Sequence, residues 1–332
     1  MKQRHATATA SALFALLPLS LLLFRLLVLL VRLRLAAFRD AALSLHFLAR
    51  LRIRPVHLRL PGTDATTVRV WCPAAPSAKP PLLLLHGFGG DSKWTWARNL
   101  PALSRHFHVY APDLLFFGAH SRSASPLRTV AFQARCAAEA MRLLGVDRYD
   151  VVGISYGGVG PVVIASSDLL KTAADDRGFL KRAGDGWSGV EEVLLPAEPA
   201  AMRKLLEMAS CRPPPPVLMP DFILRDFIQK LFTENREQLI QLFKGITVGT
   251  DKFPVTPMSQ EVLIVWGEQD QLFPVEKAYA VQSSLDGKAR VEIISKTGHA
   301  PQLEDPTRFN KILLDFLLAT HKPDPSSNGA SQ

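Results

Sequence analysis

A serine flanked by glycines, Ser155, is the first residue whose surroundings predict chemistry. It lies in the pattern Gly153-Ile-Ser-Tyr-Gly157, directly after the apolar residues Val151 and Val152. This pattern is typical of a sharp, strained strand-to-helix turn, which requires glycine and exposes the serine hydroxyl over the end of a sheet. One chance match in a chain of this length has a probability of roughly one in ten, so other residues must support the interpretation.

Two later residues supply the partners that a serine nucleophile requires. Asp270 follows an aliphatic run at 262–266, and His299 follows a second run at 291–294. A histidine accepts the serine proton, and a carboxylate fixes the histidine tautomer and stabilises the imidazolium. The chain order Ser155, Asp270, His299 is one of the orders in which this triad commonly occurs. The pattern therefore predicts catalysis by an activated serine.

Glycines on both sides of Phe88 indicate how a tetrahedral oxyanion would be stabilised. Phe88 is the centre of His-Gly-Phe-Gly-Gly at 86–90, which follows an apolar run at 82–85. Backbone N–H groups aimed at the developing charge are common donors to such an anion. We expect these donors to be the N–H groups of Phe88 and Tyr156.

Four other polar residues near these motifs have simpler interpretations. His86 belongs to the glycine-rich loop and is expected to be structural rather than catalytic. Asp113 also follows a predicted strand and is a rival acid, but it precedes the serine, so the later aspartate is preferred. Lys296 and Glu304 flank the histidine and are interpreted as solvated charges.

The elements that must position these side chains alternate along the chain. Runs without polar alternation are expected of strands buried on both faces of a parallel sheet. Helical spacing recurs at 130–144 and in a helix that begins after Asp91 or Ser92 and continues through Trp96 and Leu100. The expected strands are 56–60, 68–71, 82–85, 108–111, the run before the serine, 162–167, 262–266 and 291–294. This alternation predicts a doubly wound, mostly parallel α/β sheet, whose sites lie at the carboxyl ends of its strands.

Together these motifs resemble those of serine hydrolases with the α/β-hydrolase fold, and the chain is similar to plant esterases and membrane-anchored monoacylglycerol lipases. The resemblance covers about 56–320 and implies a core formed by 55–167 and 259–320. In that family a helical cap covers the pocket, and the matching segment here, 168–258, repeats apolar residues at helical spacing. The resemblance implies a small lipophilic ester substrate, and it implies neither a metal nor an organic cofactor.

One segment departs from the family pattern, directly after the serine. Residues 159–161 alone separate Gly158 from the aliphatic run 162–167, whereas a crossover between parallel strands needs about a dozen residues. Relative to the pattern, roughly fifteen residues are missing, together with the helix that follows the serine. We expect either that 161–170 becomes helical and the sheet loses a strand, or that the turn at the serine is distorted. Either outcome would leave an active site that is encoded but poorly assembled.

Residues 1–54 are predicted to be a membrane anchor with a basic linker. The segment 12–31 is apolar except for Pro18, Ser20 and Arg25. Its leucine, phenylalanine and valine side chains favour insertion by about 6 kcal/mol, against about 3 kcal/mol for one central arginine. A cleaved signal peptide is the main rival interpretation, and a transit peptide a weaker one. Arginines are frequent between 32 and 54, which places the body of a single-pass protein in the cytosol.

Composition limits the partners of the chain. Residues 1–54 hold nine Lys or Arg against one acid and so carry +8 of the net charge of +9, which leaves the rest of the 332 residues nearly neutral. A nucleic-acid partner is therefore not expected. Cys72, Cys136 and Cys211 lack metal-ligand spacing and are interpreted as ordinary thiols. The segment 321–332 is expected to be a disordered tail, and the oligomeric state stays open.

Two alternatives to ester hydrolysis also stay open. The same fold can serve as a non-catalytic ligand-binding protein, which the shortened segment after Gly158 favours and the complete triad opposes. The same triad can also hydrolyse carbon–carbon bonds. Epoxide hydrolysis is disfavoured, because the similar proteins that perform it carry aspartate where Ser155 stands.

Overall fold

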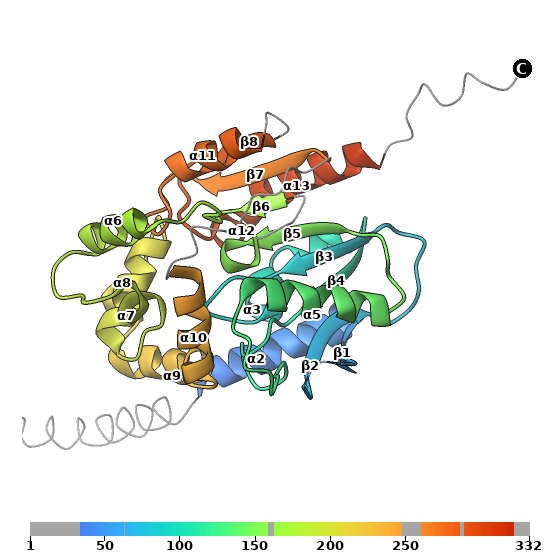
Figure 1. The fold of residues 1–332 in the computed structure, drawn as a ribbon, viewed down its shortest axis with the longest axis horizontal. Helices are drawn as coiled ribbons and strands as arrows, with labels where there is room; N and C mark the ends of the chain where they lie inside the picture. Colours follow the sequence, from blue (N-terminus) through green and yellow to red (C-terminus); the bar gives the residue numbers. More distant parts are fainter. Residues whose placement is uncertain (1–33, 63, 159–162, 248–259, 286–288, 322–332) are drawn as a thin grey trace, which may run out of the picture.

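The buried aliphatic runs of the sequence form the strands of an eight-stranded sheet. The computed structural model describes residues 34–62, 64–158, 163–247, 260–285 and 289–321 (Figure 1). The strands are β1 Ile53–Arg59, β2 Thr67–Pro73, β3 Pro81–Leu85, β4 His108–Pro112, β5 Asp150–Ile154, β6 Val163–Ala165, β7 Val262–Gly267 and β8 Ala289–Ile294. Their order is β1-β2-β4-β3-β5-β6-β7-β8. The pairs β1–β2 and β2–β4 are antiparallel and the others are parallel, which confirms the predicted mostly parallel sheet.

Helices cover both faces of this sheet. The helices are α3 Ser92–Trp96, α4 Leu100–Leu103 and α13 Pro306–Thr320 on one face, and α5 Val130–Leu143 and α11 Glu276–Ser284 on the other. The Asp91 carboxylate caps α3 by accepting from two backbone N–H groups, as the sequence predicted. The helix expected to run through Leu100 is instead two short helices, because Pro101 has no N–H with which to continue the first.

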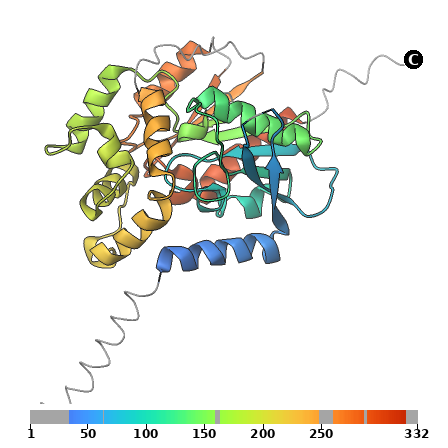
Figure 2. The same cartoon turned by 60° about the horizontal axis from the view of Figure 1, so that its bottom comes forward.

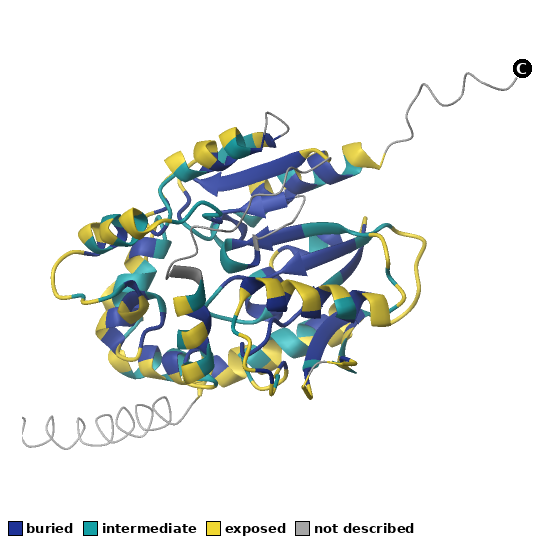
Figure 3. Ribbon diagram, in the orientation of Figure 1, coloured by how far each residue is buried: buried dark blue, intermediate teal, exposed yellow. Residues whose placement is uncertain are grey.

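Successive side chains of the central strands pack into different cores. In β3, Leu82 and Leu84 pack with Trp96 of α3, whereas Leu83 packs with Phe132 of α5. All residues of β7 are buried, so this strand is dark blue throughout in Figure 3. Burial on both faces explains why these strands appear in the sequence as continuous apolar runs rather than as alternating patterns.

A group of helices forms the described part, 168–247, of the segment predicted as a cap. They are α6 Ala173–Ala183, α7 Val190–Leu194, α8 Pro199–Ala209, α9 Asp221–Leu231 and α10 Arg236–Thr247, with a 3₁₀ turn, η3 Pro216–Leu218, before α9. In Figure 1 they lie together at the end of the sheet toward which β7 points. Ile228, Leu239 and Phe243, which repeat at helical spacing, are buried. Residues 248–258 of the predicted cap lie outside the described residues.

The short segment after Ser155 keeps its strand. β6 has three residues and pairs in parallel with both neighbours, so that Ile164 lies opposite Gly153 of β5 and Ile264 of β7. The expectation that the sheet would lose a strand is therefore wrong, because hydrogen bonds to two neighbouring strands hold even a short strand in place. The turn η2 Ser155–Gly158 is a single 3₁₀ turn. Residues 159–162 lie outside the described residues.

The first described helix packs on the body of the protein. α2 Leu35–Leu45 continues into a π-helical turn, η1 His46–Arg50, and Figure 2 shows α2 lying along the body. Phe47 is fully buried, with its ring centroid 5.2 Å from that of Trp71. The C-terminal part of the predicted anchor-and-linker segment is therefore helical and packs against the body of the protein. The predicted span 12–31 and residues 322–332 of the predicted tail lie outside the described residues, within which no helix is long and apolar enough to cross a bilayer.

Candidate active site

The serine, aspartate and histidine predicted from the sequence lie together at the carboxyl ends of three parallel strands. Ser155 follows β5, Asp270 follows β7 and His299 follows β8. Nε2 of His299 lies 3.0 Å from Ser155 Oγ, and Nδ1 lies 2.8 Å from Asp270 Oδ2. Both are hydrogen-bond distances. A carboxylate can only accept, so Nδ1–H donates to Asp270, which leaves Nε2 to accept the serine proton.

Ser155 has the backbone conformation of a strained turn. Its φ of 52° lies in the left-handed region, which is costly for a residue other than glycine. Packing beneath the turn requires Gly157, where a Cβ would lie 2.6 Å from the carbonyl oxygen of His86. Ser167 Oγ donates to the carbonyl oxygen of Ser155 at 2.5 Å. These contacts hold the turn so that its hydroxyl meets the imidazole.

Asp270 is held by its own loop. Its side chain is fully buried, and Oδ1 accepts from the N–H groups of Leu272 and Phe273, each at 2.9 Å. These two bonds fix the plane of the carboxylate and leave Oδ2 for the imidazole. The Phe273 ring also packs edge to face against the His299 ring, with centroids 5.2 Å apart. One loop therefore orients both the acid and the histidine.

The predicted cap is attached to the loops that carry the acid and the histidine. At the end of α8, the Ala209 carbonyl accepts from the N–H of His299 at 2.8 Å, and the Met208 carbonyl accepts from the N–H of Gln271 at 3.3 Å. From α6, the guanidinium of Arg182 donates to the Gln271 carbonyl at 2.8 Å. These contacts were not predicted from the sequence, because their acceptors are main-chain carbonyls, which any residue supplies.

Glu304 is not the solvated charge that the sequence suggested. Its Oε1 accepts from the N–H of Gly298 at 2.7 Å, and its Oε2 accepts from the N–H of Cys211 at 2.9 Å. The carboxylate thereby ties the residue before the histidine to the segment that leaves α8. Glu304 ends a short helix, α12 Pro301–Glu304, and its closeness to the histidine in sequence was its one available signal. Lys296 is exposed, as expected.

The two residues predicted as oxyanion donors lie beside the serine. A Cβ on Gly87 would lie 3.1 Å from Ser155 Cβ, so the loop that leads to Phe88 passes directly over the serine. The Phe88 and Tyr156 rings meet edge to face, with centroids 5.2 Å apart. Burial raises the pKa of the Tyr156 hydroxyl, which therefore stays protonated. Further members of this aromatic cluster are Phe117 and Phe243. The donor role of the two N–H groups remains a prediction.

His86 and Asp113 have partners of their own. His86 is fully buried: its Nδ1–H donates to the Gly87 carbonyl at 2.8 Å, and its Nε2 accepts from the N–H of Leu114 at 2.9 Å. Burial lowers the pKa of His86 to about 4, so the ring is neutral at physiological pH. Asp113 is also fully buried and forms an ion pair with Arg69. Both residues therefore have structural contacts that do not involve the triad.

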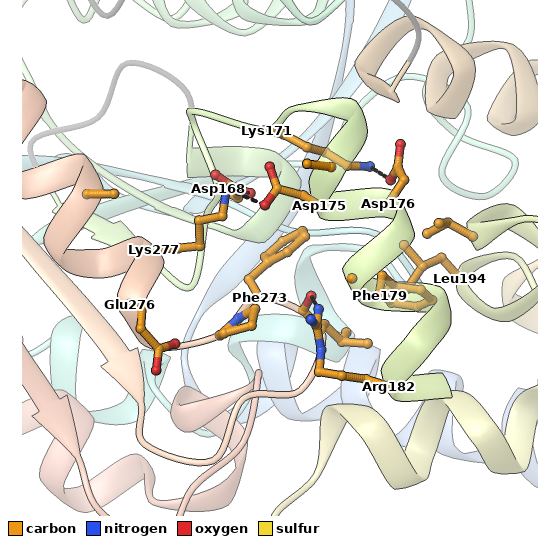
Figure 4. Close-up of a pocket in the computed structure, with 16 residues that line it drawn as sticks. Asp168, Lys171, Asp175, Asp176, Phe179, Arg182, Leu194, Phe273, Glu276 and Lys277 are labelled. Atoms are coloured by element: carbon orange, nitrogen blue, oxygen red, sulfur yellow. Dashed lines mark hydrogen bonds and ion pairs between the residues drawn. The ribbon is translucent and has the colours of Figure 1, made fainter. Parts of the chain in front are cut away.

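A cavity of about 380 Å³ lies beside the acid loop, between α6, α7 and α11 (Figure 4). Phe273, whose ring also packs against the His299 ring, forms part of its wall. Lys277 crosses one side and pairs with Asp168 at 3.2 Å and with Asp175 at 2.6 Å. Apolar side chains on the opposite side include Phe179 and Leu194. The cavity beside the acid loop thus combines a charged wall with an apolar one.

The cysteines and the potential metal ligands of the described residues do not cluster. No group of three or more His, Cys, Asp or Glu side chains there is arranged to hold a metal ion. Cys72 and Cys136 are buried, Cys211 is partly exposed, and all three are unpaired. Burial raises the pKa of Cys136 to about 11, so this thiol stays protonated and is a poor nucleophile.

Known proteins resemble this chain in sequence and in fold. Human monoacylglycerol lipase ABHD6 is 26% identical over 278 residues, which cover 75% of this chain and 78% of that protein. A 2-hydroxy-6-oxononadienedioate/2-hydroxy-6-oxononatrienedioate hydrolase of Paraburkholderia phymatum is 25% identical over 271 residues, covering 76% and 92%. The crystal structure of a bacterial membrane phospholipase A has a TM-score of 0.67 at 21% identity and covers 92% of this chain and 98% of that one.

A family model extends over most of the sheet and over the segment between its sixth and seventh strands. It is described as the alpha/beta hydrolase family and matches residues 82–312, which is more than half of the chain and includes the serine, the aspartate and the histidine. Relatives named as lipases and hydrolases agree with that match. The chain belongs to the alpha/beta hydrolase family.

Proposed function

We propose that this protein is a serine hydrolase that cleaves a lipophilic carboxylic ester through an acyl-enzyme intermediate. The observation that carries the proposal is the pair of hydrogen bonds from His299 to Ser155 and to Asp270, at 3.0 and 2.8 Å. A serine becomes a useful nucleophile when a base within hydrogen-bond reach accepts its proton and a third group orients that base. This arrangement meets both conditions.

In the acylation step, Ser155 Oγ attacks the ester carbonyl carbon while its proton moves to Nε2 of His299. The carbonyl oxygen becomes an oxyanion, which the N–H groups of Phe88 and Tyr156 are proposed to stabilise. The tetrahedral intermediate then collapses, and the imidazolium gives its proton to the departing alcohol. Asp270 stabilises the imidazolium throughout.

In the deacylation step, water takes the place of the alcohol. His299 removes a proton from the water, whose oxygen attacks the acyl carbon, and a second oxyanion forms in the same position. Collapse of this intermediate breaks the bond to Ser155 Oγ and returns the proton to the serine. The products are a carboxylic acid and an alcohol, and the residues regain their starting state.

Apolar surroundings support a lipophilic substrate. The Phe88, Tyr156 and Phe243 rings pack together beside the serine, and Phe243 comes from α10 of the proposed cap. Such a surface suits an acyl chain, because burying apolar area stabilises the complex by about 25 cal/mol per Å². The human relative's name, monoacylglycerol lipase, is consistent with this substrate class.

The short turn after Ser155 belongs to the proposal as well. The serine opens a single 3₁₀ turn, Ser155–Gly158, where the family pattern has a full helix. A helix that starts at the serine would direct its positive end toward the oxyanion, and one turn supplies less of that field. We therefore expect turnover below that of family members that retain the helix.

Hydrolysis of a carbon–carbon bond is the second candidate, favoured by the relative from Paraburkholderia phymatum whose name describes a 2-hydroxy-6-oxo dienedioate hydrolase. Comparing carboxylic esters of increasing acyl length with a vinylogous diketone separates the two. The proposal predicts turnover of the esters that is lost in Ser155→Ala. Turnover of the diketone without turnover of the esters would contradict ester hydrolysis and support hydrolysis of a carbon–carbon bond. Saturable ligand binding without turnover, unchanged by Ser155→Ala, would indicate a non-catalytic binder.

The membrane anchor at 12–31 is proposed from the sequence alone. Its length and apolar composition suit a single span, and the arginines that follow place the body in the cytosol. Carbonate extraction of membranes tests it. Retention of the intact chain in the membrane pellet is expected, and its complete release into the supernatant would exclude the anchor.

A further inference from the structure

The outer face of α2 and η1 carries large exposed apolar side chains. Phe38, Leu45 and Leu48 are 70%, 65% and 48% exposed. Their spacing, with Ala41 and Ala42 exposed between them, places them along one side of the helix. A soluble surface helix normally presents polar residues on its outer side, so this stripe needs a partner.

The inner face of the same helix packs tightly on the body. Ala36 and Phe47 are fully buried, and the Asp40 carboxylate accepts from Lys93 Nζ at 2.8 Å and from Trp94 Nε1 at 2.9 Å. Burial raises the pKa of Asp40, but hydrogen bonds from Lys93 and Trp94 together with the charges of Lys93 and Lys230 outweigh it and hold the pKa below its ordinary value. The helix is therefore firmly oriented, and its outward stripe is a fixed property of the fold.

Charge complementarity selects the partner. Within 34–54 the one acidic residue is Asp40, which is turned inward onto Lys93. The same segment carries the exposed residues Arg34, Arg39 and Arg50, of which Arg39 has its guanidinium over the Trp94 ring, 4.6 Å from the centroid. Apolar side chains flanked by arginines are typical of a helix that lies in the plane of an anionic bilayer surface. The chain that leads into this helix, residues 1–33, is rich in apolar residues and holds three arginines, one lysine and no acid.

Contacts on its inner side connect this helix to the cap. The N–H of Ala36 donates to Asp226 of α9 at 2.7 Å, and Lys230 of α9 pairs with Asp40 at 3.3 Å. The ring of Phe227, also on α9, packs on Trp94 of α3 with centroids 5.7 Å apart. The position of α2 therefore determines where α9 sits relative to any surface that α2 contacts.

We propose that α2 and η1 form an interfacial platform, which lies on an anionic lipid surface through Phe38, Leu45 and Leu48 and seats cap helix α9 beside that surface. Eleven residues of α2 are too few to span a bilayer but suffice to lie on one. The platform is distinct from the anchor proposed at 12–31 and does not depend on the chemistry of the serine.

Quenching of tryptophan fluorescence by brominated lipids, measured on the full chain, tests the platform. Tryptophan is placed on the stripe as Phe38→Trp and Leu45→Trp, and as a matched control at Tyr279→Trp. Tyr279 is 50% exposed on α11, which lies on the opposite side of the molecule from α2 in Figures 1 and 2. Each variant is mixed with phosphatidylcholine and phosphatidylglycerol vesicles whose acyl chains are brominated near the headgroup. Subtracting the signal of the unchanged protein removes the contribution of the native tryptophans.

The platform predicts at least about twofold stronger quenching at positions 38 and 45 than at 279, because the stripe reaches the upper part of the acyl chains. Equal quenching at all three positions would overturn it, even if the chain still binds the vesicles through another segment. Emission from positions 38 and 45 that shifts to the blue with protein concentration, in the absence of vesicles, would also overturn it and would assign the stripe to a second copy of the chain.

Discussion

The two halves of the site are held in different ways. The acid and histidine loops are fixed by many hydrogen bonds, which come from Leu272, Phe273, Ala209 and Glu304 and join segments far apart in the chain. The serine turn is fixed mainly by close backbone packing and by one hydroxyl, Ser167, in a segment with a single 3₁₀ turn behind it.

The orientation of the His299 ring and the position of Ser155 therefore depend on different kinds of contact. Hydrogen bonds with defined geometry set the direction of the imidazole. Some of them come from α6 and α8 of the proposed cap, so these helices are mechanically linked to the acid and histidine loops. Ser155 is positioned mainly by the close approach of backbone at Gly157, with one side-chain hydrogen bond from Ser167. Catalytic groups need to be held within about 0.5 Å of their productive positions, so each half should fail in its own way when its supports are removed.

Removing the acid is expected to have the largest effect. Asp270→Asn keeps the shape of the side chain, but its amide no longer selects the tautomer that has Nε2 free to accept a proton. We predict a fall in kcat of about 10⁴-fold with the fold retained. Steady-state ester hydrolysis and circular dichroism measure the two properties. Asp315→Asn, on an exposed i,i+4 pair with Lys311, is the control and should change neither.

Acid pH is expected to lower the free energy of unfolding, because His86 is buried in the loop that passes over the serine. Because His86 has a pKa of about 4 in the folded protein and about 6.5 when unfolded, the unfolded chain binds more protons between these values. Stability therefore falls as pH drops from about 6.5 to 4, by up to about 1.4 kcal/mol per pH unit.

Denaturant unfolding at several pH values measures this slope. His86→Gln supplies a similar donor and acceptor without a titrating ring, and it should flatten the dependence. The exposed His106→Gln is the control and should leave the slope unchanged. A wild-type slope that persists in His86→Gln would assign the acid sensitivity to another group.

Loosening the histidine loop is expected to have a smaller effect than removing the acid. Glu304→Ala deletes the acceptor for the N–H groups of Gly298 and Cys211, so the imidazole should sample more orientations. We predict about a tenfold loss of kcat with little change in KM, partly recovered in Glu304→Gln. Glu292→Ala removes a carboxylate that pairs with an exposed arginine, and its kinetics should match those of the unchanged protein.

The smallest predicted effect concerns the serine half. Ser167→Ala removes the hydroxyl that donates to the carbonyl oxygen of Ser155, and we expect kcat to fall by about two- to fivefold. Ser283→Ala, which removes a comparable hydroxyl from the exposed side of α11, should have no effect on kcat. If kcat fell more in Ser167→Ala than in Glu304→Ala, the serine turn would depend on hydrogen bonds more strongly than the histidine loop does, contrary to the difference described above.

Residue type and burial explain why much of this fold was predictable from sequence. Strands buried on both faces must be apolar throughout, so runs such as 82–85 and 262–266 identified β3 and β7. The meeting of Ser155, Asp270 and His299 was predictable because the proposed chemistry admits few side chains, and because the ends of parallel strands lie on one edge of the sheet.

Contacts that do not depend on residue type were missed. The loss of a strand after Gly158 was expected from the length of ordinary crossovers, yet β6 forms with three residues because two neighbouring strands pair with it. Glu304 looked like a surface carboxylate, because its partners are backbone N–H groups that any residue could supply. The packing of α2 on α9 depends on segments nearly two hundred residues apart, as in the bond from Ala36 to Asp226.

Covalent labelling with a fluorophosphonate, followed by peptide mapping of the full chain, determines whether Ser155 is an activated nucleophile. We expect one adduct on Ser155, which is absent in Ser155→Ala and forms far more slowly in His299→Gln. A folded protein that forms no adduct, or labelling that persists elsewhere in Ser155→Ala, would contradict the assignment of Ser155 as the activated nucleophile.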